Sequence, residues 1–506
     1  MDSYWFSDAE PLEFPALQEN RSADILIIGA GITGLLAAYC LSKAGKKVLI
    51  VDAAAQMGGG ETGCTTAHLT WVIDSGYAEI RKFFGIENAR LVLESHKIAV
   101  DFIENIIREE KIDCDFKRVD AYAFLGPKDK KEVFEQELKT LHGLGATEAR
   151  LEPKAPFDFF DTGICLLYPH QAQFHPLKFL SGLVKSIKKN GGEIFGSAHI
   201  SHIETGKVKT EKGNEIIARQ IIVATHSPIK NILFFLKEAA YRTYAIACKI
   251  KKNEVPAGLY WDTADPYHYM RTQPVDDKSD LLIVGGGDHK TGQNDDYEAT
   301  LDNLESWAKE NFPMFKKTDY AWSGQVIMPE DGLAFIGPSP YHKGIYIATG
   351  YAGNGMTYAA IAALIFRDIL FGKKNEWAEL YNPTRKNLDG TGNFLKENLN
   401  MVKEMISGHL ERGDIENSEQ LSNGEGAIIT KGLAHLAVYR DDKGQLHSSS
   451  ANCTHLGCVV QWNAAQKTFD CPCHGSRFSG KGEVLCGPAI RNLKNTVAKA
   501  AVPSKK

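Results

Sequence analysis

Residues 23–52, ADILIIGAGITGLLAAYCLSKAGKKVLIVD, decide the fold of this chain. The apolar run 24–28 predicts a buried strand, and the small and apolar residues after the glycines predict a helix. Gly45 is placed to end that helix, and the following KKVLIVD predicts a second buried strand. A strand, a helix and another strand in this order form a βαβ unit, which predicts an α/β domain with a parallel sheet.

The turn after the first strand fits the pattern G-x-G-x-x-G, with Gly29, Gly31 and Gly34 at its fixed positions. The first glycine allows the tight turn, the second lets a pyrophosphate approach the backbone, and the third lets helix and strand pack closely. The helix N-terminus favours an anion there. Asp52 ends the second strand, where it can accept a hydrogen bond from a ribose hydroxyl. The stretch therefore predicts a dinucleotide site.

Length and composition exclude several classes of protein. The chain has 506 residues, of which 43% are hydrophobic and 24% charged, so we expect two or three globular domains. A net charge of −5, with Lys and Arg spread along the chain, argues against a nucleic-acid partner. No apolar run reaches the roughly 18–20 residues of a membrane span, and the acidic N-terminus has no apolar core. We expect a cytoplasmic protein with no transmembrane segment.

The remaining pattern is mixed. Helical periodicity occurs at 86–110, 129–142, 301–311 and after Gly355, and strands are expected at 192–222, 260–288 and 344–350. Residues 260–288 have the turn between apolar runs that is typical of antiparallel strands. We expect GGGDHKTG (285–292) to be a strand end and loop, because it lacks the spacing of a second dinucleotide site.

Residues 21–390 resemble the D-amino-acid oxidase/glycine oxidase family of FAD-dependent enzymes. The resemblance is carried by GAGITG, GGGETGCTTA (58–67), IIVATHSP (221–228) and the segments PEDGLAFIG and GIYIATGYAGNGMT within 329–357. It implies FAD as the cofactor, with an antiparallel-sheet substrate domain interleaved with the FAD-binding domain. It also places two groups of residues against the two sides of the flavin: Thr62, Gly63, Thr65 and Thr66 on one, and Gly350, Gly353, Gly355, Met356 and Thr357 on the other. Two of these glycines also suit a helix-start turn. Cys64 departs from the family pattern and is either inert or close enough to the flavin for a covalent link.

Tyr269 and Arg271 are the candidate catalytic residues. They alternate along a predicted strand, so they share a face. The family resemblance implies that such an arginine clamps a substrate carboxylate in a bidentate manner, and a structural ion pair is the alternative. His268 and Trp261 are further pocket candidates without an assigned role.

A pair of histidines, His170 and His175, has the H-x₄-H spacing of an iron motif. The acid expected three residues before the first histidine is Leu167, so we expect ordinary polar residues near a cofactor pocket.

A second group of candidate functional residues lies near the C-terminus, where five of the ten cysteines cluster. CTHLGC (453–458) and CPCHGS (471–476) each supply one Cys and one His: Cys453 with His455, and Cys471 with His474. A tetrahedral zinc site is one alternative. Two cysteines on one iron and two histidines on the other is the ligand set of a Rieske [2Fe–2S] centre, which the spacing favours.

Residues 415–500 resemble Rieske proteins through CTHLGC, CPCHGSRF and the Gly-Pro-Ala loop at 487–489. The resemblance implies that Cys458 and Cys473 form a disulfide between the cluster loops, with a reduced thiol pair as the alternative. Ser476 matches a serine that donates to a bridging sulfide. Phe478 departs, because respiratory Rieske proteins have a hydrogen-bonding tyrosine there, so we expect a lower reduction potential than theirs.

These observations predict four segments: an N-terminal tail (1–20), an FAD-dependent oxidoreductase (21–392), a linker helix (393–414) and a small all-β Rieske domain (415–506). Together they predict a dehydrogenase: an amine or amino-acid-like donor gives a hydride to FAD, and electrons pass singly to the cluster and then to an external acceptor, a protein or a quinone. The alternatives are a reductase that works in the opposite direction and a redox sensor or electron carrier without substrate turnover.

Overall fold

A computed structural model of the chain describes residues 3–227, 237–293, 296–385, 400, 403–405, 407–409, 413–432 and 434–496. The chain divides into two compact units. The first unit contains residues 1–228, 242–288 and 300–391, and the second contains residues 229–241, 289–299 and 392–506. The second unit therefore includes two short segments that precede the predicted Rieske domain in the sequence.

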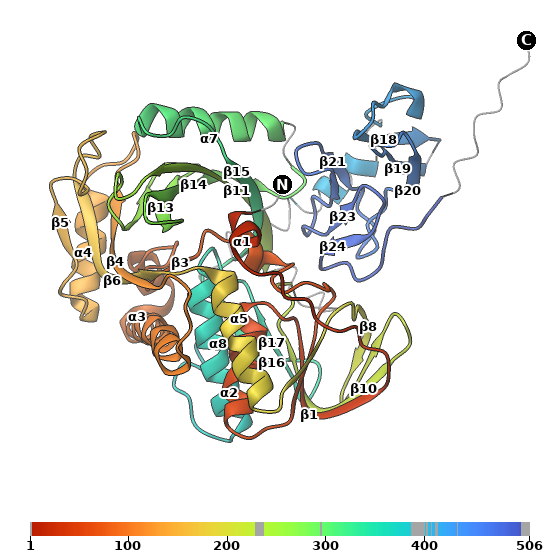
Figure 1. The fold of residues 1–506 in the computed structure, drawn as a ribbon, viewed down its shortest axis with the longest axis horizontal. Helices are drawn as coiled ribbons and strands as arrows, with labels where there is room; N and C mark the ends of the chain where they lie inside the picture. The colour runs from red at the N-terminus through yellow and green to blue at the C-terminus, as the bar shows by residue number, and fades with distance from the viewer. Residues whose placement is uncertain are drawn as a thin grey trace, which may run out of the picture. The chain divides into compact units, whose positions relative to one another are not determined.

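The first sheet of the first unit has eight strands, in the order β16-β17-β10-β1-β2-β7, with β9 paired to β10 and β8 paired to β9. Strands β1, β8, β10, β16 and β17 of this sheet are labelled in Figure 1. Strand β1 pairs in parallel with β10 on one side and β2 on the other. The GAGITG turn follows β1 at the carboxyl edge of the sheet, where ligands bind in open α/β sheets. The strands are β1 (Arg21–Ile28), β2 (Val48–Val51), β7 (Glu193–Phe195), β8 (Ile200–Glu204), β9 (Lys207–Thr210), β10 (Glu215–Val223), β16 (Phe335–Pro338) and β17 (Ile345–Thr349).

The second sheet has nine strands, in the order β15-β11-β14-β13-β12-β4-β6-β3, with β5 on β6. The predicted antiparallel strands are present as β12, β13 and β14, while β12 pairs with β4 in parallel. Strand β14 continues to Lys290, so residues 285–290 are the predicted strand end and the loop begins at Thr291. The strands are β3 (His68–Leu69), β4 (Lys117–Phe124), β5 (Arg150–Glu152), β6 (Cys165–Gln173), β11 (Glu238–Lys251), β12 (Leu259–Asp262), β13 (Tyr269–Pro274), β14 (Ser279–Lys290) and β15 (Tyr320–Pro329).

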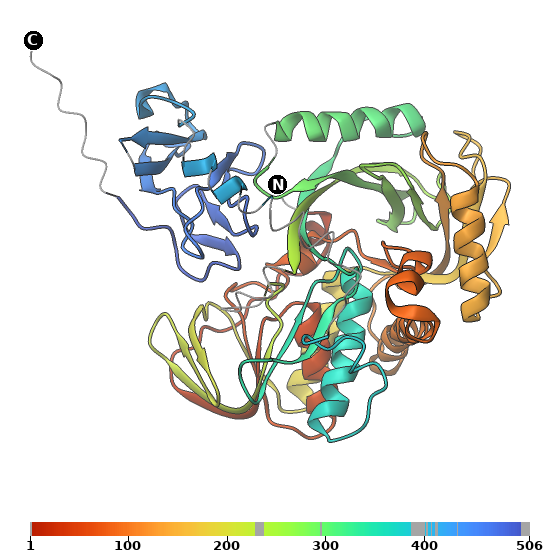
Figure 2. The same ribbon diagram turned by 180° about the vertical axis from the view of Figure 1, so that it is seen from behind.

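Helices cover both sheets. Helix α2 is buried almost throughout, because it packs against α5 and α8 beside the first sheet. Each buried Leu or Ile in such a helix contributes about 1.5–3 kcal/mol. Helix α7 runs alongside the second sheet in both views (Figures 1 and 2). The helices are α2 (Ile32–Lys43), α3 (Tyr77–Glu110, kinked at Gly85), α4 (Glu132–Leu144), α5 (Pro176–Lys189), α7 (Tyr297–Asn311) and α8 (Gly355–Leu370), with a 3₁₀ turn, η1, at Glu61–Cys64.

The N-terminus is more ordered than the sequence predicts. Residues Tyr4–Asp8 form a short helix, α1, where an irregular tail was expected. Tyr4 and Trp5 are buried in the main hydrophobic core. The aromatic side chains account for the difference, because burying them stabilises a helix too short to form alone.

The second unit contains a small all-β domain. A three-stranded antiparallel sheet precedes a four-stranded antiparallel sheet, and the core contains Cys453, Cys458, Cys471 and Phe478. The core therefore lies directly beneath the segments 453–458 and 471–476. The elements are η2 (Ser418–Gln420), β18 (Gly426–Lys431), β19 (Ala434–Arg440), β20 (Leu446–Ser450), β21 (Gln461–Asn463), β22 (Thr468–Asp470), β23 (Arg477–Ser479) and β24 (Val484–Cys486).

The predicted linker helix at 393–414 lies largely outside the described residues, and residues 400, 403–405 and 407–409 are helical. Within the part of the chain that the structure describes, no helix is both long and apolar enough to cross a membrane.

Candidate functional site

The glycine turn has the geometry of a dinucleotide cradle. A Cβ atom on Gly29 would lie 2.3 Å from the Ala224 carbonyl oxygen, and one on Gly34 would lie 1.8 Å from the Gly29 oxygen. These two glycines are required by close backbone packing. Gly31 is different, because only Thr62 Oγ1 lies within 4 Å of its Cβ position. The space that remains above Gly31 is the space a pyrophosphate needs.

Asp52 closes the cradle. Its carboxylate accepts hydrogen bonds from the main-chain N–H groups of Ala30 (2.6 Å) and Ala54 (2.7 Å). Burial raises the pKa of Asp52, and these two hydrogen bonds oppose the rise. The side chain is half-buried and holds the glycine turn, while its contact with a ribose stays a prediction.

The segment containing Thr62, Gly63, Thr65 and Thr66 lies next to this cradle. Thr62 Oγ1 accepts from the Ile32 N–H at 3.1 Å, at the start of α2. The N-terminal residues hold the segment in place, because Trp5 Nε1 donates to the Thr65 carbonyl at 2.6 Å and Ser3 Oγ donates to the Gly63 carbonyl. No sequence motif indicates these supports, and the only signal for them is the aromatic content of a stretch without periodicity.

The glycine-rich segment 350–357 contains the turn before α8 and the first residues of that helix. Thr357 Oγ1 donates to the Thr70 carbonyl at 2.6 Å, and Asn354 Nδ2 donates to the Val72 carbonyl at 3.0 Å. Gly350 and Met356 are buried, and Gly355 has open space at its Cβ position. A Cβ on Gly353 would lie 2.2 Å from Asp74 Oδ2. The start of α8 thus packs against residues 70–74, and the contacts of the segment 350–357 with FAD stay predictions.

We call this space the inner cavity and define it by the side chains of His68, Asp74, Tyr267, Tyr269 and Asp288. The side chain of Asp74 is exposed, and the other four side chains are partly exposed. At the same time each of the five is surrounded by enough protein that desolvation is the largest cause of its pKa shift. Side chains that are accessible and at the same time surrounded by protein line an interior space. The rings of Tyr267 and Tyr269 lie 5.3 Å apart, and the ring of His68 lies 5.7 Å from that of Tyr269.

Two carboxyl groups face this cavity from distant parts of the sequence. Burial raises the pKa of Asp74 to about 7, and the nearby charge of Asp288 acts in the same direction. Burial also raises the pKa of Asp288 to about 6, while a hydrogen bond from Thr243 opposes the shift. Asp288 Oδ1 is buried and accepts no hydrogen bond from the residues that the structure describes. The cavity therefore contains two carboxyl groups that ionise fully only as pH rises through this range.

Glycines shape the wall of this cavity. A Cβ on Gly285 would lie 2.2 Å from the ring of Tyr269, so the ring lies across β14 only because that position has no side chain. The Tyr269 hydroxyl hydrogen-bonds with Thr243 Oγ1 at 2.8 Å. The GGGD segment, predicted from its sequence to be a strand end and loop, thus supports an aromatic residue and an acid at the site.

Arg271, predicted to clamp a carboxylate, is fully buried. Its guanidinium donates to the carbonyl oxygens of Thr66 (2.6 Å), Phe174 (3.2 Å) and Thr272 (3.4 Å), and it lies over the ring of Trp5. These bonds direct the guanidinium at main-chain oxygens. The geometry gives the clamp prediction no support.

His268 and Trp261, the further pocket candidates, contact other side chains of the protein. His268 binds Asp262 Oδ2 at 2.7 Å and stacks on Trp307, and Trp261 stacks on Tyr168.

The two histidines of the H-x₄-H pair have different environments. His175 is fully buried and caps α5 by accepting from the Lys178 N–H, whereas His170 is exposed. Cys64 is only partly buried, and its relation to the flavin stays open.

The predicted cluster ligands come together in the second unit. Cys453 and Cys471 are buried with their sulfur atoms in hydrogen-bond contact, and the rings of His455 and His474 lie 4.9 Å apart. Two sulfurs and two imidazoles therefore form adjacent pairs, which is the arrangement that two irons need. Ser476 also lies in hydrogen-bond contact with the Cys453 sulfur. The residues fit a [2Fe–2S] group, and their assignment as ligands stays a prediction.

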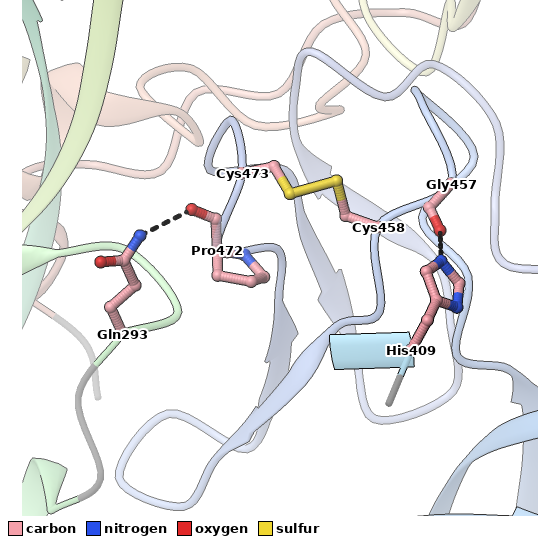
Figure 3. The surroundings of a disulfide bond; sticks show 6 residues. All are labelled: Gln293, His409, Gly457, Cys458, Pro472 and Cys473. Atoms are coloured by element: carbon pink, nitrogen blue, oxygen red, sulfur yellow. Dashed lines mark hydrogen bonds between the residues drawn. A yellow bond between two sulfur atoms is a disulfide. The ribbon is translucent and has the colours of Figure 1, made fainter. Parts of the chain in front are cut away.

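A disulfide between Cys458 and Cys473 joins the two loops that carry these residues (Figure 3). The sulfurs of Cys458, Cys471 and Cys473 lie within 4.8 Å of one another, but the disulfide uses two of them, so this trio is not a metal site. Phe478 is fully buried in β23 beneath the loops.

Comparisons with known proteins match both halves of the chain. Residues 24–369 match the family model for FAD dependent oxidoreductases, and residues 412–497 match that for the Rieske [2Fe–2S] domain. The Rieske 2Fe-2S iron-sulfur protein YhfW of Bacillus subtilis is 35% identical over 500 residues, which is 97% of each chain. The gamma-glutamylputrescine oxidoreductase of Escherichia coli is 25% identical over 73% of this chain and 88% of its own length.

Solved structures show the same fold for the first part of the chain. Glycine oxidase from Geobacillus kaustophilus superimposes with a TM-score of 0.60 at 16% identity, covering 72% of this chain and 100% of that one. L-proline dehydrogenase from P. horikoshii gives a TM-score of 0.59 at 18% identity, covering 72% of this chain and 98% of that one. The cradle, the inner cavity and the cluster loops thus agree with both family matches. The chain belongs to the FAD dependent oxidoreductase family and carries a C-terminal Rieske domain, so its cofactors are FAD and a [2Fe–2S] cluster.

Proposed function

We propose that this protein is a dehydrogenase that oxidises an amine and passes the electrons, one at a time, through the Rieske cluster to an external acceptor. The observation that carries the proposal is the inner cavity, where Asp74 lies beside Gly353 of the predicted flavin-side segment and Asp288 lies near Asp74. Bound FAD supplies a two-electron acceptor, and the Rieske cluster supplies a one-electron carrier.

The carboxylates suit a donor with a positively charged nitrogen. Asp288 Oδ1 has no hydrogen-bond donor among the described residues, and an ammonium group would supply one. Tyr267 and Tyr269 lie near these acids, and aromatic rings attract cations. In this scheme the carboxylates bind the charged amine, one of them takes up its proton, and the neutral amine is the form that gives up the hydride.

Arg271 then has a positioning role. Its bonds to the Thr66 and Phe174 carbonyls join the predicted flavin-side segment to the end of β6. The name of the E. coli relative, an oxidoreductase of gamma-glutamylputrescine, also supports an amine over a simple amino acid. The names of the structural neighbours point to amino acids, so amino acids belong in the test.

The Rieske domain favours a dehydrogenase over an oxidase. An enzyme that passes electrons from its flavin directly to oxygen has no need of a one-electron carrier. The acceptor is proposed to be a protein or a quinone, and the direction of electron flow is part of the proposal.

The test is anaerobic reduction of the purified protein with a panel of monoamines, diamines and amino acids. We expect an amine to bleach the flavin absorbance and then to produce the EPR signal of a reduced Rieske cluster. Reduction by amino acids alone would restore Arg271 as a carboxylate clamp. Reduction only by a ferredoxin-type donor would support the reductase, and no turnover with either donor would support the carrier.

A further inference from the structure

A loop from outside the Rieske domain contacts one of its cluster loops within the second unit. The loop follows β14, and a Cβ on Gly292 would lie 2.8 Å from the Pro472 nitrogen and 3.0 Å from the Cys471 carbonyl carbon. Gly292 also has a φ of +72°, which side chains disfavour. Only glycine therefore allows this direct main-chain contact with the 471–476 loop.

The next residue makes a directed hydrogen bond. Gln293 Nε2 donates to the Pro472 carbonyl oxygen at 3.0 Å, as Figure 3 shows. Asn400 Nδ2 donates to Gln293 Oε1 at 3.3 Å, so the amide of Gln293 is held at both ends. The main chain of the loop is fixed as well, because the Thr291 N–H donates to the Ala240 carbonyl at 3.0 Å.

The Pro472 carbonyl belongs to the same peptide group as the Cys473 N–H. That N–H, together with the N–H of His474, lies in hydrogen-bond contact with the Cys471 sulfur. A hydrogen bond to the oxygen of a peptide group polarises the group and makes its N–H a stronger donor. Asn400, Gln293 and the Pro472–Cys473 peptide thus form a chain of donors that ends at the sulfur of a proposed iron ligand.

We propose that Gln293, oriented by Asn400, is a positioning residue that raises the reduction potential of the Rieske cluster. Reduction adds negative charge, which is shared by the ligand sulfurs, so a stronger N–H donor stabilises the reduced form more than the oxidised form. This inference rests on the proposed role of Cys471 as a ligand. It does not depend on the substrate, because a potential is measured with mediators alone.

The same hydrogen bonds explain what a covalent fusion adds to a Rieske domain. The tuning residue precedes the Rieske match at 412–497 and lies between β14 and α7 of the FAD-dependent part of the sequence. The potential of the cluster would then depend on a residue that the domain itself does not contain.

The experiment is an EPR-monitored redox titration of the full-length protein, comparing wild type with Gln293→Met. Methionine has nearly the same length but no N–H donor. Gln445→Met, in the exposed turn between β19 and β20, is the matched control. We expect Gln293→Met to titrate at a lower potential than both wild type and the control, and Asn400→Leu to shift in the same direction by less.

An unchanged or higher potential in Gln293→Met, with normal iron and sulfide content, overturns the proposal. If Gln293→Met fails to assemble the cluster, Asn400→Leu decides, because it leaves Gln293 in place and removes only its orienting donor. An unchanged potential in that variant is equally negative. Cys471→Ser tests the assumption that Cys471 is an iron ligand. If this variant retains the full cluster, the ligand assignment is wrong, and the hydrogen-bond chain is not the cause of a negative result.

Discussion

Replacing either acid of the inner cavity should weaken amine oxidation while leaving the fold intact. Asp74→Asn and Asp288→Asn are isosteric changes that remove one charge each. The amide introduced at position 288 would keep an oxygen for the Thr243 hydrogen bond, which is the contact that the structure gives Asp288. The effect should therefore be confined to binding and oxidation of the donor.

The size of the effect follows from the hydrogen bond that each substitution weakens. A hydrogen bond to a charged group contributes about 1.5–3 kcal/mol, and 1.4 kcal/mol corresponds to a factor of ten. Each variant should lower kcat/KM for the amine by roughly 10- to 150-fold. Asp277→Asn, an identical change in the exposed turn between β13 and β14, is the control and should match wild type.

The pH profile gives an independent readout. The carboxyl pKa values of about 7 for Asp74 and about 6 for Asp288 mean that the pair becomes fully charged only as pH rises through this range. Binding of an ammonium group should strengthen over the same range in wild type, and the single variants should flatten this rise.

The same shifts predict a change in stability. A carboxyl pKa raised above its unfolded value of about 3.9 means that the folded state disfavours ionisation, so stability is lost as pH rises toward the folded pKa. Asp74→Asn removes this loss. Its Tm relative to wild type, in the absence of substrate, should be higher at alkaline than at acid pH.

The assay is steady-state oxidation of the amine found in the anaerobic screen, with an artificial electron acceptor, from acid to alkaline pH. Flavin content and circular dichroism establish that each variant is folded and loaded. Values of kcat/KM that equal those of Asp277→Asn at every pH would falsify the role of the two acids.

Three further outcomes follow from the structure. Gly29→Ala should yield protein with little bound FAD and a lowered Tm, because the new Cβ would lie 2.3 Å from the Ala224 oxygen at a φ of +107°; normal flavin content would contradict this close packing. Phe478→Tyr should raise the cluster potential, since a hydroxyl is added to a buried ring beneath the cluster loops, and redox titration that finds no upward shift rejects this. Arg271→Lys should reduce flavin retention and Tm, because an ammonium cannot reproduce the planar fork that spans the Thr66 and Phe174 carbonyls; a rise in KM alone would instead indicate substrate contact.

Both cofactors could be predicted from the sequence because each site is encoded locally. The glycine turn and Asp52 belong to one βαβ unit, in which short-range geometry places strand, helix and acid together. Each cluster loop likewise carries its cysteine and histidine two or three residues apart. Local patterns of this kind can be recognised in the sequence without any knowledge of the tertiary fold.

The donor site and the control of the cluster were decided by the tertiary structure alone. Asp74 follows β3 and Asp288 lies in β14, so neither local sequence indicates that the two acids are neighbours. The pairing of strands in the second sheet and the loop at Gly353 bring them to one cavity. The packing of the second sheet also buries Arg271, to which the family resemblance gave a substrate-binding role. Gln293 reaches Pro472 only because a glycine turn lets two distant backbones touch. Such contacts depend on long-range packing, which no short stretch of sequence contains.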